Sequence, residues 1–424
     1  YRDLLPLTDL PVPRCYYASV SSWSRDFLAL LSDGAYLGPA RGRVSSQTLG
    51  TMAVRPGLGV PDAICAPGFL PEVFDATPPV DMPESYLAVE RVPEVVSTMK
   101  RACVLMSKMH AKFWGDYSLF SRDLSLNNRD KLSECFALMK GSWEKTKAKA
   151  RSGKYEGKCG PWRGLPRGEW EGFEEMVEQT LMYPNIRWGL KTHGRGNGWR
   201  RQDEDTYRWD IIADAGFTLI HGDFHAENVF IRKLSEEEEG GERKVGEKAG
   251  ADHMEKKKYK TGPRSSKEPT PEFLILDWQL PEVGDPIKDI ARMTVMGGLD
   301  NYHRNVHEKA IVRAWWEALI EHGVPEAEYP WDLAWVSYRW WCGWQAALVL
   351  MACHVAKWFE EHDGAGYRTA VDKFKAVVHF HGDPRKLFEE RAAILKRIGK
   401  VWRPAEGSPE EAAVEGRRYG TSKK

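Results

Sequence analysis

The chain has 424 residues, of which 42% are hydrophobic, so its length allows one large two-lobed unit or two to three small domains with a real core. Lysine plus arginine and aspartate plus glutamate each total 61, so the formal net charge is zero and no global basic field for binding nucleic acid exists, although a local patch is not excluded. The seven cysteines are odd in number and scattered without a C-x-x-C pair, which predicts neither a disulfide framework nor a zinc cage. We therefore expect a reducing, cytoplasmic setting.

The sequence predicts neither a secretory leader nor a membrane span. The opening residues, YRDLLPLTDLPVP, lack the basic and apolar regions of a secretory leader, so we expect none. The most apolar run, 344–359, is shorter than the roughly 20 residues of a membrane span, and Arg339 lies just before it. We expect a buried helix there, no membrane association and no obligate protein partner.

The first predicted elements are two short strands, at 26–31 and 85–92, within a segment rich in proline and glycine. From Val95 to Met109 apolar residues recur at helical spacing, which predicts an amphipathic helix ending near HAKFWG. Further helical patterns cover about 130–150 and 170–182.

Three β-type segments follow, FTLIHGD, NVFIRK and FLILDW. Between the second and third, residues 234–271 are charged and nearly devoid of large apolar side chains, so they cannot bury enough surface to offset ordering entropy, and we predict a disordered insertion. Without it, the flanking strands become a hairpin with polar residues at its tip.

Aromatic residues crowd 335–345; they are expected to be core, although they could line an acceptor pocket. Residues 403–424 are predicted to be a flexible tail. The remaining helices are predicted at about 286–297, 304–322, 331–361 and 384–400.

The segment HGDFHAEN, residues 221–228, places two histidines, two carboxylates and an amide between two predicted strands. Asp223 and Asn228 stand five positions apart, and Asp277 ends the next strand. Phosphoryl transfer requires such a set, because one carboxylate accepts the proton of the attacking hydroxyl while an amide oxygen and a second carboxylate hold magnesium against the nucleotide phosphates. Loops on rigid strands are suited to presenting these side chains.

H-G-D-x-x-x-x-N followed by a strand ending in I-L-D-W resembles the aminoglycoside phosphotransferase and choline kinase-like superfamily, which is itself similar to protein kinases. The segments DWQ, GDPIKDIARM and MSKMHAKFWGD resemble its ecdysteroid-kinase-like (CHK kinase-like) branch, and the likeness spans about residues 95–358. The resemblance implies that Asp223 is the catalytic base and that Asn228 and Asp277 are the magnesium ligands. It also implies that Asp289 is a buried buttress of the catalytic loop.

The fold implied by the resemblance is α+β, protein-kinase-like and two-lobed. A small β-containing N-lobe and the hinge, with DFLALLSDG as the hinge candidate, occupy 1–92, and a large, mostly helical C-lobe occupies 93–402. The first lysine is Lys100 and no Gly-rich nucleotide loop precedes the hinge, so the N-lobe is expected to be truncated, with an irregular insertion at 34–80. ATP and magnesium are the implied cofactors, and the acceptor is a hydroxyl of a small molecule.

Each candidate residue also has a structural alternative. Asp223 and Asn228 could be turn residues that bond local N–H groups. For Asp277 the metal role is favoured, because the residue ends an apolar strand, where an unpaired carboxylate is costly. The segment GDPIKDIA is best explained as a helix start with Asp285 at the N-cap and Pro286 at the first helical position.

Two further functions stay open. The missing lysine and glycine loop fit a pseudokinase that binds a ligand or partner without turnover. The pattern H-x-D-x-H, made by His221, Asp223 and His225, is compatible with a metallohydrolase, but it leaves Gly222 and DWQ unexplained. We expect His221 to be a structural hydrogen-bonding residue, and we assign no role to His225 or Glu227.

Overall fold

The computed structural model describes residues 7–12, 15–20, 27–31, 92–116, 118–119, 129–152, 162, 165–187, 216–231, 273–278, 280–296, 299–354 and 365–399. Outside these residues lie the predicted insertion 234–271, the tail 403–424, the irregular segment 34–80, and all of the strand predicted at 85–92 except Val92.

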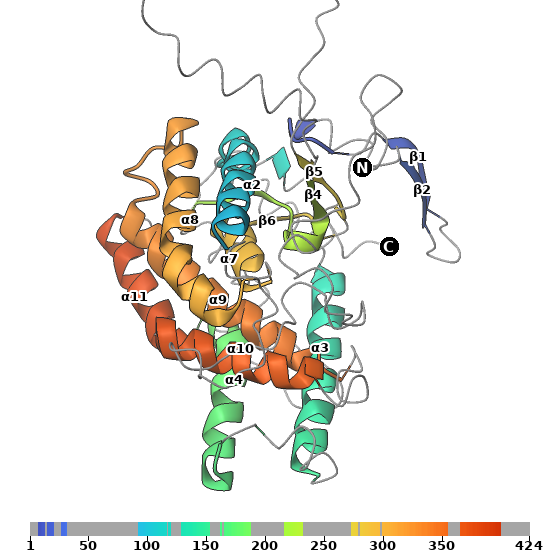
Figure 1. The fold of residues 1–424 in the computed structure, drawn as a ribbon, viewed down its shortest axis with the longest axis vertical. Coiled ribbons are helices and arrows are strands. Elements are labelled where there is room, and N and C mark those ends of the chain that lie inside the picture. The colour runs from blue at the N-terminus through green and yellow to red at the C-terminus, as the bar shows by residue number, and fades with distance from the viewer. Residues whose placement is uncertain are drawn as a thin grey trace, which may run out of the picture.

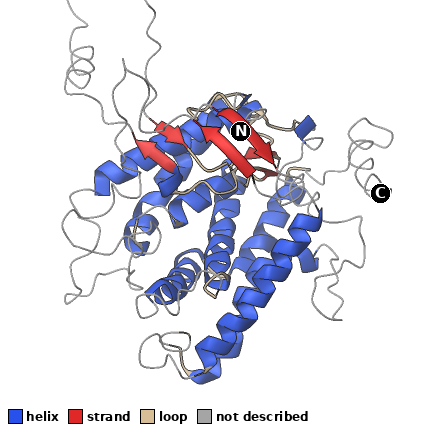
Figure 2. Cartoon of the chain, turned by 90° about the vertical axis from the view of Figure 1, so that its right-hand side faces the viewer, coloured by secondary structure: helices blue, strands red, loops and turns tan. Residues whose placement is uncertain are grey.

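Helices make up most of the described chain (Figure 1). They are α2 (Val92–Lys112), α3 (Arg129–Arg151), α4 (Trp170–Arg187), α7 (Ile287–Val295), α8 (Asn301–Glu321), α9 (Trp331–Met351), α10 (Ala365–His381) and α11 (Pro384–Arg397). The strands are β1 (Cys15–Val20), β2 (Phe27–Leu31), β3 (Thr218–Ile220), β4 (Val229–Ile231), β5 (Phe273–Ile275) and β6 (Glu282–Gly284). The fold is therefore mostly helical with a few short antiparallel strands, and this composition agrees with the α+β class. Figure 2 shows the strands gathered at one end of the helical body.

The helix predicted from Val95 is confirmed as α2, which begins three residues earlier, at Val92. Its apolar positions, among them Met99, Met106 and Met109, are fully buried and pack along α8. Burying a side chain of this size contributes about 1.5–3 kcal/mol relative to exposure. The amphipathic pattern therefore fixes which face of α2 turns toward α8.

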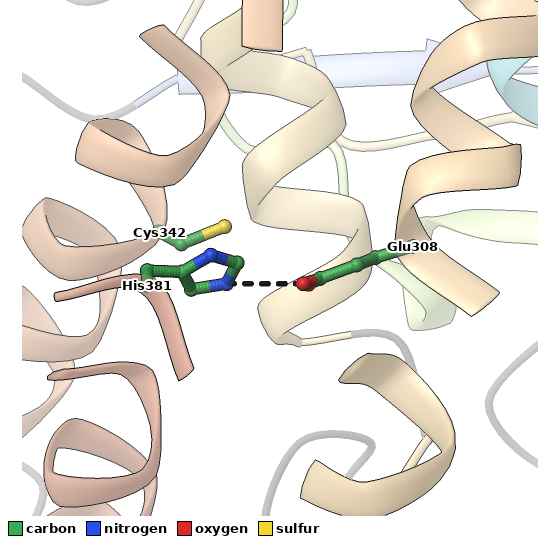
Figure 3. A group of neighbouring side chains, drawn as sticks. All are labelled: Glu308, Cys342 and His381. Atoms are coloured by element: carbon green, nitrogen blue, oxygen red, sulfur yellow. Dashed lines mark ion pairs between the residues drawn. The ribbon is translucent and has the colours of Figure 1, made fainter. Parts of the chain in front are cut away.

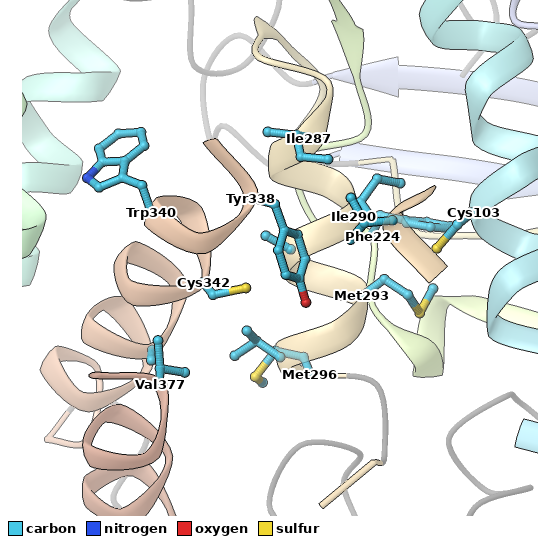
Figure 4. Close-up of a cluster of buried hydrophobic side chains, with 14 of the residues drawn as sticks. Cys103, Phe224, Ile287, Ile290, Met293, Met296, Tyr338, Trp340, Cys342 and Val377 are labelled. Carbon is cyan, nitrogen blue, oxygen red and sulfur yellow. The ribbon is translucent and has the colours of Figure 1, made fainter. Parts of the chain in front are cut away.

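Helix α7 lies in the middle of the core, between α2 and α9 (Figure 4). Ile287, Ile290 and Met293 are fully buried on it, close to Tyr338 of α9. Phe224 from the polar loop is buried in the same cluster. The loop that carries the candidate catalytic residues is thus anchored to the helical core by an apolar side chain.

The strands form three antiparallel pairs. β4 pairs with β5, with Val229 opposite Ile275, so the predicted hairpin-like arrangement is confirmed. β3 pairs with β6, a strand that the sequence did not predict. β1 pairs with β2, which contains most of the strand predicted at 26–31. The backbone N–H of Ile275 also donates to the carbonyl of Pro11 at 2.8 Å, which joins residues 7–12 to β5.

One helix prediction was wrong in its extent, and one helix was missed. The helix predicted over 331–361 ends at Met351, and a separate helix, α10, occupies 365–381, where none was predicted. Tyr367, Phe374 and Val377 of α10 are buried, and their spacing was a helical signal in the sequence. Because α10 packs on α9, a single continuous helix could not place these side chains in the core.

The start of α7 also differs from the prediction. Pro286, rather than Asp285, stands at the N-cap, and the Asp285 carboxylate one residue earlier accepts from the backbone N–H of Ile287 at 3.3 Å. The same carboxylate is buried and accepts from three more distant side chains, those of Tyr329, Trp341 and Arg391. Asp285 therefore joins α7, α9 and α11 in addition to its local bond.

Within the described residues, none of the helices combines the length and the apolar run that crossing a membrane requires. The apolar run that starts at Trp344 forms the second half of α9, where most of its side chains are buried.

Candidate functional site

The polar loop 221–228 is held by one buried carboxylate. Oδ2 of Asp289 accepts from the backbone N–H of His221 at 2.8 Å, and Oδ1 accepts from that of Gly222 at 2.9 Å. Nε2 of His110 lies 3.3 Å from Oδ2, while its Nδ1 accepts from the indole N–H of Trp315 at 3.2 Å, so Nε2 carries the proton that points to the carboxylate. Asp289 thus has three donors inside the core, as a buttress of the loop requires.

Gly222 permits the sharp path of the chain after His221. Its φ is +81°, in the left-handed region, and a Cβ built on it would lie 1.9 Å from the carbonyl oxygen of Leu280. Leu280 is brought there by the pairing of β3 with β6, in which Ile220 stands opposite Glu282. Only glycine fits both the backbone angle and this contact. The middle position of H-G-D therefore has a steric cause.

His221 is a structural residue, as expected. Its ring is buried, Nε2 donates to the carbonyl of Leu276 at 2.7 Å, and Nδ1 accepts from the backbone N–H of Asp223 at 3.3 Å. Burial lowers the pKa of His221, so the ring stays neutral. The ring also packs on Trp278, with centroids 4.4 Å apart. Because both nitrogens are engaged, His221 offers no atom to a metal ion, and this arrangement removes one of the three ligands that a metallohydrolase would need.

Asp223 is held as an ion by Arg292 of α7. Nε and Nη2 of Arg292 donate to Oδ1 at 3.0 and 2.6 Å, and Nη1 donates to Oε1 of Gln345 on α9 at 3.1 Å. Nε2 of His225 lies 3.7 Å from the other oxygen, Oδ2. Burial favours the neutral acid, but contact with His225 and the charge of Arg292 outweigh it and hold the pKa of Asp223 well below its usual range. The carboxylate is therefore charged and fixed in orientation at neutral pH.

Asn228 lies next to Asp223. Its Nδ2 donates to the backbone carbonyl of Asp223 at 3.0 Å and lies 3.1 Å from Nε2 of His225. The side chain is nearly buried. Both contacts use the amide nitrogen, so the amide oxygen, which is the atom that would face a cation, takes no part in them. The structure thus brings two of the three predicted site residues together.

Asp277 follows β5 at the same end of the β4–β5 pair. The ladder continues one residue past Ile275, because the backbone N–H of Leu276 donates to the carbonyl of Asn228 at 2.9 Å. Asp277 comes directly after that bond, is partly exposed, and has a φ of +59°. A left-handed non-glycine residue is uncommon, and such backbone conformations concentrate at functional sites. Strand pairing therefore brings the backbones of Asn228 and Asp277 to one edge.

The aromatic stretch 335–345 is mainly core, as expected. Trp340 is buried, while Trp341 and Trp344 are partly exposed. The ammonium of Lys288 lies 5.3 and 4.9 Å from the ring centroids of these last two residues and forms an ion pair with the buried Glu282. These rings therefore already have a cationic partner from within the protein.

Three residues at this site were missed in the sequence. Arg292 and Gln345 were not singled out, and His225 was assigned no role, yet all three contact the polar loop or the residue that orients it. Arg292 follows Asp289 by three positions, so both lie on one face of α7. That spacing was the available signal; nothing in the sequence pointed to Gln345.

Comparison of the chain with protein-family models, with curated proteins and with solved structures gives no match. The resemblance to aminoglycoside phosphotransferases and choline kinases therefore depends on the motif residues, and what it implies for fold and function stays a prediction.

Proposed function

We propose that the chain is a magnesium- and ATP-dependent phosphotransferase with a kinase-like, two-lobed fold, acting on a hydroxyl group of a small molecule. One observation carries the proposal. The loop 221–228 is held at its backbone by the buried Asp289, and it presents the ionised Asp223 beside Asn228 at the strand edge that leads to Asp277. If Asp223 were only a turn residue with local bonds, its loop would not need to be held by Asp289 of α7, with His110 of α2 and Trp315 of α8 behind that carboxylate.

Asp223 would orient the acceptor hydroxyl. Its low pKa makes it a weak base, but phosphoryl transfer passes through a loose transition state in which positioning and charge stabilisation supply most of the rate increase. Arg292 fixes the rotamer of Asp223 by two bonds to Oδ1, so the hydroxyl would approach Oδ2, which lies 3.7 Å from Nε2 of His225. The proton would pass to Asp223 late in the reaction, as the new phosphate ester forms.

Asn228 and Asp277 would hold magnesium. An amide oxygen and a carboxylate are hard donors, which Mg²⁺ prefers. Bound magnesium would neutralise the charge of the nucleotide phosphates. The backbone of β2, within the DFLALL segment, is the proposed hinge for adenine.

The test is a screen of hydroxylated metabolites with labelled ATP on the full-length protein, followed by Asp223→Asn and Asp277→Asn. Each variant is expected to lower transfer by at least about a hundredfold. Asp300→Asn is the matched control, because Asp300 is also a partly buried carboxylate, with 17% of its side chain exposed against 15% for Asp223, but it caps α8. Transfer that survives both site variants, or no ATP-dependent product from any acceptor, would refute the proposal.

The Arg292–Asp223 contact also favours a second candidate, a protein that binds a nucleotide or ligand without turnover. An arginine that neutralises the central carboxylate suits a permanent binding site as well as a catalytic one. Calorimetry separates the two candidates: tight binding of ATP and magnesium without phosphate transfer to any acceptor supports the second and contradicts the first.

A further inference from the structure

Three buried side chains with metal-binding atoms meet far from the polar loop in sequence. Glu308 comes from α8, Cys342 from α9 and His381 from the last residue of α10 (Figure 3). Each residue is at most 3% exposed, and their ligating atoms lie within 4.8 Å of one another. Figure 3 shows the imidazole and the carboxylate pointing toward each other, with the thiol beside the ring.

The distance between the nitrogen and the oxygen fits two ligands of one ion. Nε2 of His381 lies 3.2 Å from Oε1 of Glu308. Two ligands of a tetrahedral zinc ion, with bonds of about 2.0–2.1 Å, stand about 3.3 Å apart. This ring nitrogen is buried, and among the described residues it forms an ion pair with that carboxylate rather than a well-aligned hydrogen bond. Taking such a pair out of water is costly, and a metal ion held between the two groups would offset part of that cost.

The surrounding residues hold the carboxylate so that its two oxygens have different roles. The hydroxyl of Tyr338 donates to Oε2 of Glu308 at 2.9 Å, and Nε of Arg304 lies 3.8 Å from the same oxygen. Oε1 is the oxygen that faces His381. The ring of Tyr338 also packs edge-on against His381, with centroids 5.9 Å apart. Such outer contacts orient the ligands of metal sites and keep them in place.

We propose that Glu308, Cys342 and His381 bind one Zn²⁺ ion, which joins α8, α9 and α10. Thiolate, imidazole and carboxylate together are a donor set that zinc accepts, whereas magnesium and calcium require oxygen donors. On binding, the Cys342 thiol loses its proton to solvent and forms the sulfur–zinc bond, so the two anionic ligands balance the charge of the ion. The fourth tetrahedral position is left to a water molecule.

This site is independent of the proposed phosphotransferase activity. None of its residues contributes to the polar loop, and its three ligands are separated by 34 and 39 positions along the chain, as the residue numbers 308, 342 and 381 give by subtraction. Such spacing lies outside any short cysteine–histidine pattern.

The experiment compares four forms of the full-length protein, purified without a metal-affinity step: wild type, Cys342→Ser, Cys353→Ser and His225→Ala. Cys353→Ser is the matched control, because Cys353 is an equally buried thiol just beyond the end of α9 and bonds only to a backbone carbonyl. His225→Ala tests whether any bound metal sits instead at the polar loop. Metal content is measured by mass spectrometry, and the apoprotein is titrated with Co²⁺.

We expect one equivalent of zinc in wild type, Cys353→Ser and His225→Ala, and at least a tenfold weaker affinity in Cys342→Ser. The cobalt form of the wild type should show the charge-transfer absorption of a thiolate bound to cobalt, and Cys342→Ser should lack it. The cobalt spectrum of the wild type needs no variant, so the test survives if Cys342→Ser fails to fold. Wild type that holds no zinc and gives no thiolate band would show that the cluster is an ion pair only. Equal metal affinity in Cys342→Ser and Cys353→Ser would overturn the assignment as well.

Discussion

Replacing Arg292 with glutamine isolates the ion pair that orients Asp223. The substitution keeps a polar side chain of similar reach and removes the cation that donates to Oδ1 through Nε and Nη2. Only 18% of the Arg292 side chain and 15% of the Asp223 side chain are exposed, so solvent screens the pair little. Removing one partner of a buried pair costs about 3–5 kcal/mol, and we expect about 3 kcal/mol here because some exposure remains.

The pH dependence of this loss follows from the direction of the pKa shift. The folded-state pKa of Asp223 lies below its unfolded value of about 3.9, so the stabilisation is fully present above that value and is lost as the pH falls through the folded-state pKa. The stability difference between wild type and Arg292→Gln should therefore become smaller as the pH falls below about pH 4.

Urea denaturation of a double-mutant cycle with Asp223→Asn measures the coupling. The double variant should be more stable than the sum of the single losses predicts, because it leaves no charge buried without a partner. Arg397→Gln is the control, since its ion pair with Asp332 is exposed and should contribute less than about 1 kcal/mol. Strictly additive losses, or a loss from Arg292→Gln no larger than that of the control, would refute this account of the site.

Three more predictions concern the loop. Gly222→Ala should destabilise the fold by several times more than Gly323→Ala in urea denaturation, because both have positive φ but only the first places a Cβ against the carbonyl of Leu280; equal losses would contradict the clash. Asp289→Asn should lower the free energy of unfolding by about 3 kcal/mol, because an amide cannot accept from both backbone N–H groups of the loop and from His110. Unchanged protection of those two N–H groups in hydrogen exchange would contradict the role of Asp289. His221 should remain neutral with the proton on Nε2 in a nitrogen-15 NMR titration, and a pKa at or above the ordinary value of about 6.5 would contradict its burial.

The helical and strand patterns predicted much of the described fold, and the failures share one cause. Met99 and Met109 predicted α2 because one helix and its buried face are encoded within a few turns. β6, by contrast, has three residues and exists because β3 pairs with it. The break between α9 and α10 was likewise missed, because the run from Trp331 onward stays apolar beyond Met351, where the helix ends.

Arg292 and His225 show that the sequence also failed to predict contacts of the polar loop that form only on folding. The sequence identified Asp223 and Asn228 because they lie five positions apart between two predicted strands, and Asp277 because it ends the next strand. All three are residue types that phosphoryl transfer uses. It did not identify which cation would face Asp223, since that depends on how α7 crosses the loop.

The sequence by itself determined the polar loop and the strand that ends before Asp277, since each depends on neighbours within a few residues. Only the tertiary structure decided that Asp289 holds the loop and that Glu308, Cys342 and His381 meet. Scattered cysteines and histidines carry no local pattern, and side chains on separate helices become neighbours only when apolar burial packs those helices together. Local spacing therefore encoded the motif of the polar loop. Helix packing brought Asp289 under that loop and brought Glu308, Cys342 and His381 together.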